Sequence, residues 1–316
     1  MKKLLTLLSL VFVLVSCGTV TYSTIEMDQV YPASIEFPAS LQKIGLVDRV
    51  NMSYVNVPSN PLCMDSKIFT EQLAKQLAEA DYFEDVILCD SDVSLWERQE
   101  GDRLLPLSKS HVENLCDDLG VDMIVSTERS YSAPLKNALS PVILAETVLR
   151  LYVPERDRPL KTIALSDTIA LDFYDSALSY GLIRNDIELY MAEKNAHYLA
   201  PYWTSVERTY FSGGNIDMRD AAMFVSQNNW EKAGELWNAG KEKAKGKLKE
   251  QFEFNLILYD EMTGNVEGAY KRCLEFQSRV ASAYEDLSVF SGYYLLILKQ
   301  RISDIQRLNL QLQRFQ

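Results

Sequence analysis

The sequence predicts an α/β domain with a mixed sheet, followed by an all-α domain of helical hairpins. Three observations support this prediction. Short apolar runs alternate with helical periodicity over residues 35–211, only helical periodicity remains over residues 216–316, and a glycine-containing linker at 212–215 separates the two. A chain of 316 residues is long enough for two such domains.

The chain begins with the pattern of an export signal. Lys2 and Lys3 precede an apolar run of about a dozen residues, which is shorter than the roughly twenty that a membrane-spanning helix needs. We therefore expect residues 1–16 to be a signal peptide that is removed, and residues 17–34 to be a tether.

The segment Leu14-Val15-Ser16-Cys17 resembles the lipobox of bacterial lipoproteins. The resemblance implies that Cys17 carries a diacylglycerol thioether and a further acyl chain, such as palmitate, on its amine. Two or three acyl chains anchor a protein stably on a membrane. Gly18 stands where an inner-membrane retention signal has aspartate, so the resemblance implies anchoring in the outer membrane, facing the periplasm.

The overall charge disfavours one class of partner. The chain has 44 acidic and 32 basic residues, a net charge of -12, which repels nucleic acid. We therefore expect no nucleic-acid partner. The run KEKAKGKLK from Lys241 to Lys249, here called the lysine-rich turn, is interpreted as a solvated helical face and loop.

Four cysteines besides Cys17 could pair in three ways. They are Cys63, Cys89, Cys116 and Cys273, and no CxxC motif occurs. Zinc and thioredoxin-like chemistry therefore lack their sequence signature. Cys89 and Cys116 lie in apolar patterns that are typical of buried free thiols.

The α/β domain begins with a strand over residues 41–50, whose compact apolar core is bounded by charge. Asp65 or Ser66 can cap a helix that continues to about Ala80. One apolar stripe supports this helix, formed by Phe69, Leu73 and Leu77. Residues 85–90 predict the second strand.

A second helix, a third strand and a hairpin follow. Ser110 and Glu113 fit a capping box for the helix, and Gly120 suits its end. The predicted third strand covers residues 121–131, the hairpin strands cover 142–153 and 160–173, and the closing helix covers 183–202.

This order of elements resembles the periplasmic α/β domain of the curli-secretion lipoprotein, the amino-terminal domain of TolB, and lipoprotein activators of peptidoglycan synthases. The helix-to-strand junction Gly120-Val121-Asp122-Met123-Ile124-Val125 is similar to the junction in those families. No catalytic motif belongs to these domains, so the resemblance implies docking or assembly rather than catalysis.

The second domain contains an internal spacing of 36 residues. Ala233 lies 36 residues before Ala269, and Trp237 lies 36 before Cys273. This spacing resembles the 34-residue tetratricopeptide repeat with a two-residue insertion. In such repeats a small residue lets two helices approach closely, which explains alanine at both positions.

Further residues support the resemblance to tetratricopeptide repeats. Asn255-Leu256 stands in the usual asparagine-leucine position and Gly264-Asn265 in the turn, and a third hairpin is predicted over 284–316 as a cap. Stacked hairpins present a concave groove to extended peptides or helices. The resemblance therefore implies that the helical-repeat groove binds envelope protein partners.

Common catalytic motifs are absent from the sequence, which contains no HExxH, GxSxG, GxGxxG or P-loop. His111 is expected at the surface and His197 partly packed. Asp90-Ser91-Asp92 could hold a metal through its carboxylates, but such patterns are common at strand ends. We predict no catalytic residue, no cofactor and no metal, and hence no enzyme.

Aromatic residues gather near the predicted domain junction, at Tyr198, Tyr202, Trp203 and Tyr210. They could stack on a sugar, but packing of helices and domains is the favoured interpretation.

The whole architecture resembles uncharacterised Bacteroidetes lipoproteins. The leading hypothesis is a membrane-anchored adaptor or scaffold that binds protein. The alternatives are a homo-oligomeric secretion or assembly component, and an envelope enzyme that acts on glycans.

Overall fold

The computed structural model describes residues 22–50, 60–94, 96–97, 104–135, 142–170 and 180–313. The predicted signal peptide and Cys17 lie outside the described residues. No helix in the described part is long and apolar enough to cross a membrane. The chain divides into two compact units, an α/β unit of residues 32–202 and 308–316 and a helical unit of residues 1–31 and 203–307.

The α/β unit is built on a five-stranded mixed sheet in the order β3-β2-β4-β5-β6. Its strands are β2 (Lys43–Asp48), β3 (Asp85–Leu88), β4 (Met123–Pro134), β5 (Val142–Tyr152) and β6 (Lys161–Ala170). β3, β2 and β4 run parallel, whereas β4, β5 and β6 run antiparallel. The predicted change from βαβ units to a hairpin, and the predicted α/β fold class, are therefore confirmed.

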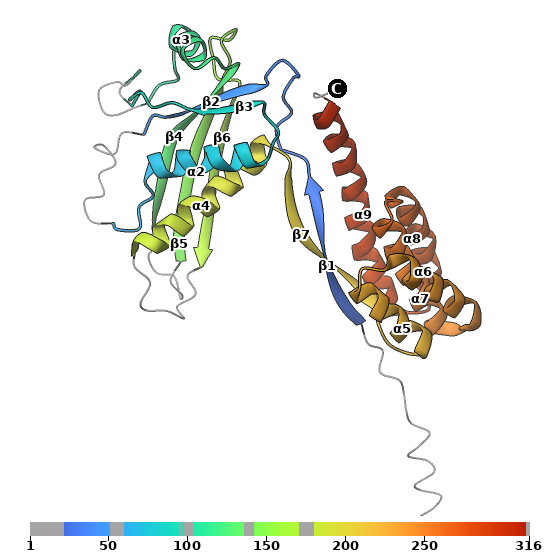
Figure 1. Cartoon of the computed structure of the whole chain (residues 1–316). Helices are drawn as coiled ribbons and strands as arrows, with labels where there is room; N and C mark the ends of the chain where they lie inside the picture. Colours follow the sequence, from blue (N-terminus) through green and yellow to red (C-terminus); the bar gives the residue numbers. More distant parts are fainter. Residues whose placement is uncertain are drawn as a thin grey trace, which may run out of the picture. The chain divides into compact units, whose positions relative to one another are not determined.

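Helices cover both faces of this sheet. α2 (Ser66–Glu79) and α4 (Tyr180–Leu199) lie side by side on one face (Figure 1), and they pack on strand residues such as Leu46 and Val125. α3 (Lys109–Leu119) packs on the alternate residues Val47 and Ile124, and so covers the other face. This alternation follows from the two-residue period of a strand.

The ends of α2 and α3 show which local signals are reliable. Asp65 caps α2 and accepts hydrogen bonds from the backbone N–H groups of Lys67 and Ile68, as predicted. Gly120 ends α3 in the left-handed conformation, with φ of 65°, also as predicted. The cap of α3 is Ser108 rather than Ser110, since the Ser108 hydroxyl accepts from the backbone of His111.

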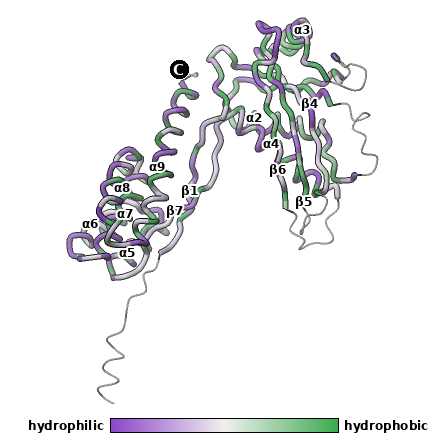
Figure 2. Tube along the Cα trace, turned by 180° about the vertical axis from the view of Figure 1, so that it is seen from behind, coloured by the Kyte–Doolittle hydropathy of each residue, from purple (hydrophilic) through white to green (hydrophobic). Residues whose placement is uncertain are grey.

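Among its described residues the helical unit contains five helices, of which four form two hairpins. α5 (Ile216–Ser226) precedes α6 (Trp230–Lys243), and α7 (Gly246–Met262) precedes α8 (Val266–Val280). Hydrophobic residues recur along these helices between hydrophilic ones (Figure 2). The aligned residues Ala233 and Ala269 are both fully buried, and so are Trp237 and Cys273. This burial agrees with the 36-residue spacing, whereas membership of the tetratricopeptide family stays a prediction.

The last helix differs from the predicted third hairpin. Residues predicted to form two helices form one, α9, from Glu285 to Leu312. The reason lies in the sequence, because residues 285–312 contain no proline and only one glycine, so no turn signal interrupts the helix.

A two-stranded ribbon completes the helical unit. β1 (Tyr22–Tyr31) pairs with β7 (Tyr202–Phe211), and contacts of Ser23 with Ser212 and of Gln29 with Arg208 make the pair antiparallel (Figure 1). The predicted tether, residues 17–34, is therefore a strand over most of its described part. Residues 203–211, assigned to the α/β domain by sequence, belong to the helical unit.

Candidate functional site

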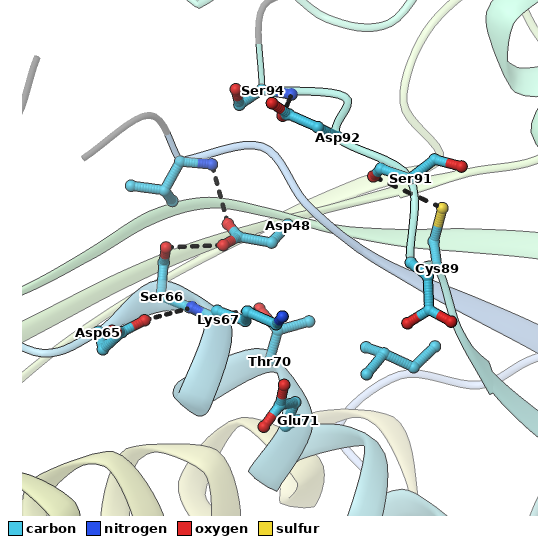
Figure 3. A pocket seen from close by; sticks show the side chains of 13 residues that line it. Asp48, Asp65, Ser66, Lys67, Thr70, Glu71, Cys89, Ser91, Asp92 and Ser94 are labelled. Carbon is cyan, nitrogen blue, oxygen red and sulfur yellow. Dashed lines mark hydrogen bonds between the residues drawn. The ribbon is translucent and has the colours of Figure 1, made fainter. Parts of the chain in front are cut away.

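A cavity of about 360 Å³ opens at the carboxyl edge of β2 and β3. Figure 3 shows its side chains, which come from the end of β2, the first turns of α2 and the loop after β3. In α/β proteins this edge of a parallel sheet is the usual place for a ligand. Five carboxylates and one ammonium line it: Asp48, Asp65, Glu71, Asp90, Asp92 and Lys67. We call it the acidic cavity.

Asp48, the last residue of β2, lines this cavity. Its carboxylate accepts hydrogen bonds from the Ser66 hydroxyl at 2.7 Å and from the backbone N–H of Val50 at 2.9 Å (Figure 3). Burial raises the pKa of Asp48, although these two hydrogen bonds oppose the shift. The carboxylate of Asp48 is therefore fixed in place at the wall of the cavity.

The start of α2 forms a second wall. Asp65, the helix cap, also donates its own backbone N–H to Glu188 Oε1 at 2.7 Å. Glu188 comes from α4 and is fully buried. Thr70, one turn into α2, shares a 2.8 Å hydrogen bond with Thr127 of β4. These contacts fix the helix start against the sheet, so the wall is rigid.

The loop after β3 forms the outer wall. The carboxylate of Asp92 accepts a hydrogen bond from the backbone of Ser94 at 2.9 Å, and hydrogen bonding to Ser94 lowers the pKa of Asp92. The predicted Asp90-Ser91-Asp92 segment therefore lines a cavity, as strand-end position suggests. Sequence reasoning missed Asp48, whose signal was its place at the end of a parallel strand.

The chemistry of the lining favours binding. Its polar side chains are carboxylates, hydroxyls, one ammonium and the Cys89 thiol, and the apolar Val50 and Leu88 complete the lining. In the described part of the chain, no three His, Cys, Asp or Glu residues are grouped so that they could hold a metal ion. An excess of negative charge in a concave site attracts a cationic group such as a lysine or arginine side chain.

The two histidines lie elsewhere. His111 stacks on Trp96, with ring centroids 4.3 Å apart, and its Nδ1 is 2.6 Å from Glu97 Oε1. His197 stacks on Tyr202 at 3.6 Å. It is half-buried, as predicted, and burial lowers its pKa. Neither ring lines the acidic cavity.

The four described cysteines are free thiols. Cys63, Cys116 and Cys273 are buried, and burial raises the pKa of both Cys116 and Cys273 to about 12. Cys116 therefore matches its predicted state. Cys89 is only half-buried, because it follows β3, where it lines the acidic cavity as well as packing against the core cluster beneath α3.

The helix α7 holds a segment of the chain itself. Asn255 of α7 accepts a hydrogen bond from the backbone N–H of Phe211 at 2.8 Å and donates one to its carbonyl at 2.7 Å. Arg208, also in β7, forms a buried ion pair with Glu261 of α7 at 2.8 Å. β7 thus lies on the helix that carries the predicted groove asparagine.

The aromatic residues near the junction do not converge. Tyr210 packs on Trp237 inside the helical unit, with ring centroids 6.4 Å apart. Trp203 is 70% exposed, and Tyr202 stacks on His197. β7 is extended between Tyr202 and Tyr210, which separates the two rings by about 26 Å at roughly 3.3 Å per residue.

These features define a two-unit protein, in which an α/β unit with an acidic edge cavity is combined with a unit of helical hairpins. The chain belongs to the family described as Domain of unknown function (DUF8603), which matches residues 41–211. Residues 219–300 match a second family, described as Domain of unknown function (DUF6340). No curated protein matches the sequence.

Several solved structures show a distant likeness. The PelC dodecamer from Paraburkholderia phytofirmans is 6% identical, with a TM-score of 0.31, and the match covers 57% of this chain and 99% of that one. The hypothetical protein CT253 from Chlamydia trachomatis is 13% identical, with a TM-score of 0.31 and coverages of 50% and 96%. A minor lipoprotein from Acinetobacter baumannii is 7% identical, with a TM-score of 0.29 and coverages of 51% and 93%. Likenesses this weak carry no argument about activity or assembly.

Proposed function

We propose that this protein is a lipid-anchored envelope adaptor that binds a protein partner through the acidic cavity of its α/β unit. The observation that carries the proposal is the cavity of about 360 Å³ with five carboxylates and one ammonium at the carboxyl edge of β2 and β3. A basic side chain of a partner fits this charge and this volume.

The contacts of Asn255 support the choice of the acidic cavity over the helical repeats as the binding site. Asn255, which stands in the asparagine-leucine position of the repeat resemblance, is fully buried and holds Phe211. A partner that used the same atoms would first have to displace β7. The acidic cavity requires no such rearrangement.

The lipid anchor rests on the sequence pattern that ends at Cys17. Labelling living cells with a palmitate analogue tests it directly. We expect label on the native protein and none on Cys17→Ala, with the outer membrane, on its periplasmic face, as the site of recovery. Equal labelling of both forms would contradict the anchor.

The partner is tested by photo-crosslinking in living cells. A photoreactive amino acid at position 94, which also lines the cavity, should capture one defined envelope protein, and the double change Asp90→Lys with Asp92→Lys should abolish the capture, because it reverses two charges of the cavity. The matched control is Asp117→Lys with Asp118→Lys, which reverses two exposed charges on α3. Loss of capture in the control as well would sink the proposal.

One observation favours a second candidate, a homo-oligomeric assembly component. β6 is the edge of the sheet as far as the described residues extend, and it pairs only with β5. A ten-residue edge strand is a place where another chain can add. Native mass spectrometry of the purified protein distinguishes the two, since only the assembly component forms a defined homo-oligomer.

A further inference from the structure

One end of the helical unit lies close to Cys17 along the chain. Only Gly18 to Thr21 separate Cys17 from Tyr22, the first residue of β1. Five residue steps span at most about 17 Å when fully extended. If Cys17 is acylated, as the proposed function requires, the beginning of β1 must therefore stay within that distance of the membrane surface.

The contacts of β1 show which residues share this end of the unit. Tyr22 meets Phe290 near the start of α9, with ring centroids 5.7 Å apart. Ser23 meets Ser212, which lies just before α5, at 2.8 Å. The end next to the anchor therefore contains the starts of α5 and α9.

The lysine-rich turn belongs to the same end. Lys247 forms an ion pair of 2.6 Å with Asp286 at the start of α9, and Lys243 lies 3.6 Å from Asp217 at the start of α5. The turn joins the end of α6 to the start of α7, so these two helix ends lie at the same end of the helical unit as the starts of α5 and α9. The sequence alone could not show that these lysines lie at the end of the helical unit where β1 begins.

The charge at this end is available for an external partner. Lys245 and Lys249 are exposed and form no ion pair with any described residue. Lys243 keeps 72% of its side chain exposed despite its contact with Asp217. Two exposed apolar side chains lie at the same end, Tyr22 at 60% and Ile216 at 65%.

The distribution of charge between the units also favours an anionic partner for the helical unit. Residues 32–202 contain 27 acidic and 15 basic side chains, which equals the whole net charge of -12, whereas residues 203–307 contain 15 and 14. With Glu26 and Asp28 of β1 added, the described helical unit has a net charge of -3, so it meets much less repulsion from an anionic surface than the α/β unit does.

We propose that the lysine-rich turn contacts anionic phospholipid head groups of the membrane that holds Cys17, while Tyr22 and Ile216 enter the head-group layer. The proposal rests on the proposed lipid anchor. Lysines next to an anionic membrane attract it, and aromatic and aliphatic side chains favour the interface. The acyl chains on Cys17 and the head-group contacts of the lysine-rich turn together then fix which end of the helical unit faces the membrane.

Vesicle binding without the acyl chains tests the contact separately from the anchor. The full mature chain with Cys17→Ser is sedimented with vesicles of phosphatidylcholine alone, or of phosphatidylcholine with phosphatidylglycerol. We expect binding only to the anionic vesicles, weakening as salt is added, since the Debye length is only about 8 Å at physiological ionic strength. Each lysine at the surface strengthens binding about five-fold, so Lys245→Gln with Lys249→Gln should weaken it roughly 25-fold.

The matched control is Lys271→Gln with Lys299→Gln, which removes two exposed lysines of α8 and α9 outside the turn. This control should bind like the parent. Equal binding to neutral and anionic vesicles, or equal loss in both double variants, would overturn the lipid contact. So would a protein crosslink from position 245 without any vesicle binding, because this result would assign the turn to a protein partner. Palmitate labelling of Cys17 is independent of all these results.

Discussion

Glu188 is a buried acid whose environment makes its charge costly. Its side chain is fully buried in α4, and one carboxylate oxygen accepts from the backbone of Asp65 while the other has no hydrogen-bond partner among the described residues. Burial raises the pKa of Glu188, although the hydrogen bond from Asp65 and the charge of Arg184 oppose the shift. The folded state therefore binds a proton more tightly than the unfolded state does.

The raised pKa of Glu188 predicts that the stability of the fold depends on pH. A raised pKa in the folded state contributes stability below the unfolded pKa of about 4.3, and that contribution is lost as pH rises through the folded value. We expect Glu188→Gln to raise the melting temperature at pH 7 relative to the parent, with the difference shrinking toward pH 4. Calorimetry across this range checks it. Glu79→Gln, at an exposed position of α2, should show no such trend.

Asn255 is the second residue with a clear energetic role. It is fully buried and satisfies both backbone groups of Phe211. Asn255→Ala leaves a buried N–H and a buried carbonyl without partners, which costs about 1–3 kcal/mol for each. We expect chemical denaturation to show a loss of about 2–6 kcal/mol in the helical unit. Asn238→Ala, which removes one hydrogen bond to Gly234 within a helix, should cost far less.

At the scale of elements, the two hairpin turns repeat each other in detail. Asn228 and Gly264 lie 36 residues apart, and both adopt the left-handed conformation, with φ of 56° and 87°. The next residues, Asn229 and Asn265, each cap the following helix with their side chains. The backbone conformation of the turn is thus repeated although Asn228 and Gly264 differ in side chain.

The glycine at this turn can be compared with a glycine inside a helix. Gly264→Ala places a side chain in the left-handed region and should destabilise the helical unit by about 1–2 kcal/mol, with no steric contribution because the site is open. Gly292→Ala, in the middle of α9, meets only ordinary contacts and should stabilise the unit by about 0.5–1 kcal/mol. Thermal unfolding of both variants gives the two signs, and the same sign for both would contradict this interpretation.

Elements with local signals were predictable and those with distant partners were not. The stripe of Phe69, Leu73 and Leu77, with a cap at Asp65 or Ser66, predicted α2 to within about a residue at each end, because caps and stripes act within a few turns. β1 and β7 pair across about 180 residues of sequence, and neither strand is followed by its partner, so no hairpin signal exists. The acidic cavity was not predicted, since Asp90 and Asp92 were noticed only as a common strand-end pattern and Asp48 joins them only in the folded sheet.

At the scale of the molecule, the α/β unit is an insertion between the two strands of the ribbon. Residues 32–202 leave from the end of β1 and return at the start of β7, while both strands belong to the helical unit. The ribbon is tied to the helices by a side chain of β7 and by a backbone carbonyl of β1. Arg208 donates to Gln29 and pairs with Glu261, and Arg301 donates to the carbonyl of Val30.

Deletion of β1 tests this organisation. Removal of residues 18–31 takes away the partner strand of β7 and two contacts of buried arginine side chains, so the helical unit should melt at a lower temperature. A loss of 2 kcal/mol or more corresponds to about 8–16 °C for a unit of this size. The α/β unit should keep its own transition. A chain that lacks only Gly18–Thr21 is the control, and it should melt like the parent.

The ribbon also determines how a mechanical load is carried. With Cys17 fixed to a membrane and a partner pulling on the α/β unit, the covalent path between the two runs through β1 alone. The helical unit stands beside this path and is held to it along the strand, so its hairpins bear little tension. Tension from the partner is therefore carried by the backbone of β1, and the pairing of β1 with β7 keeps this segment extended.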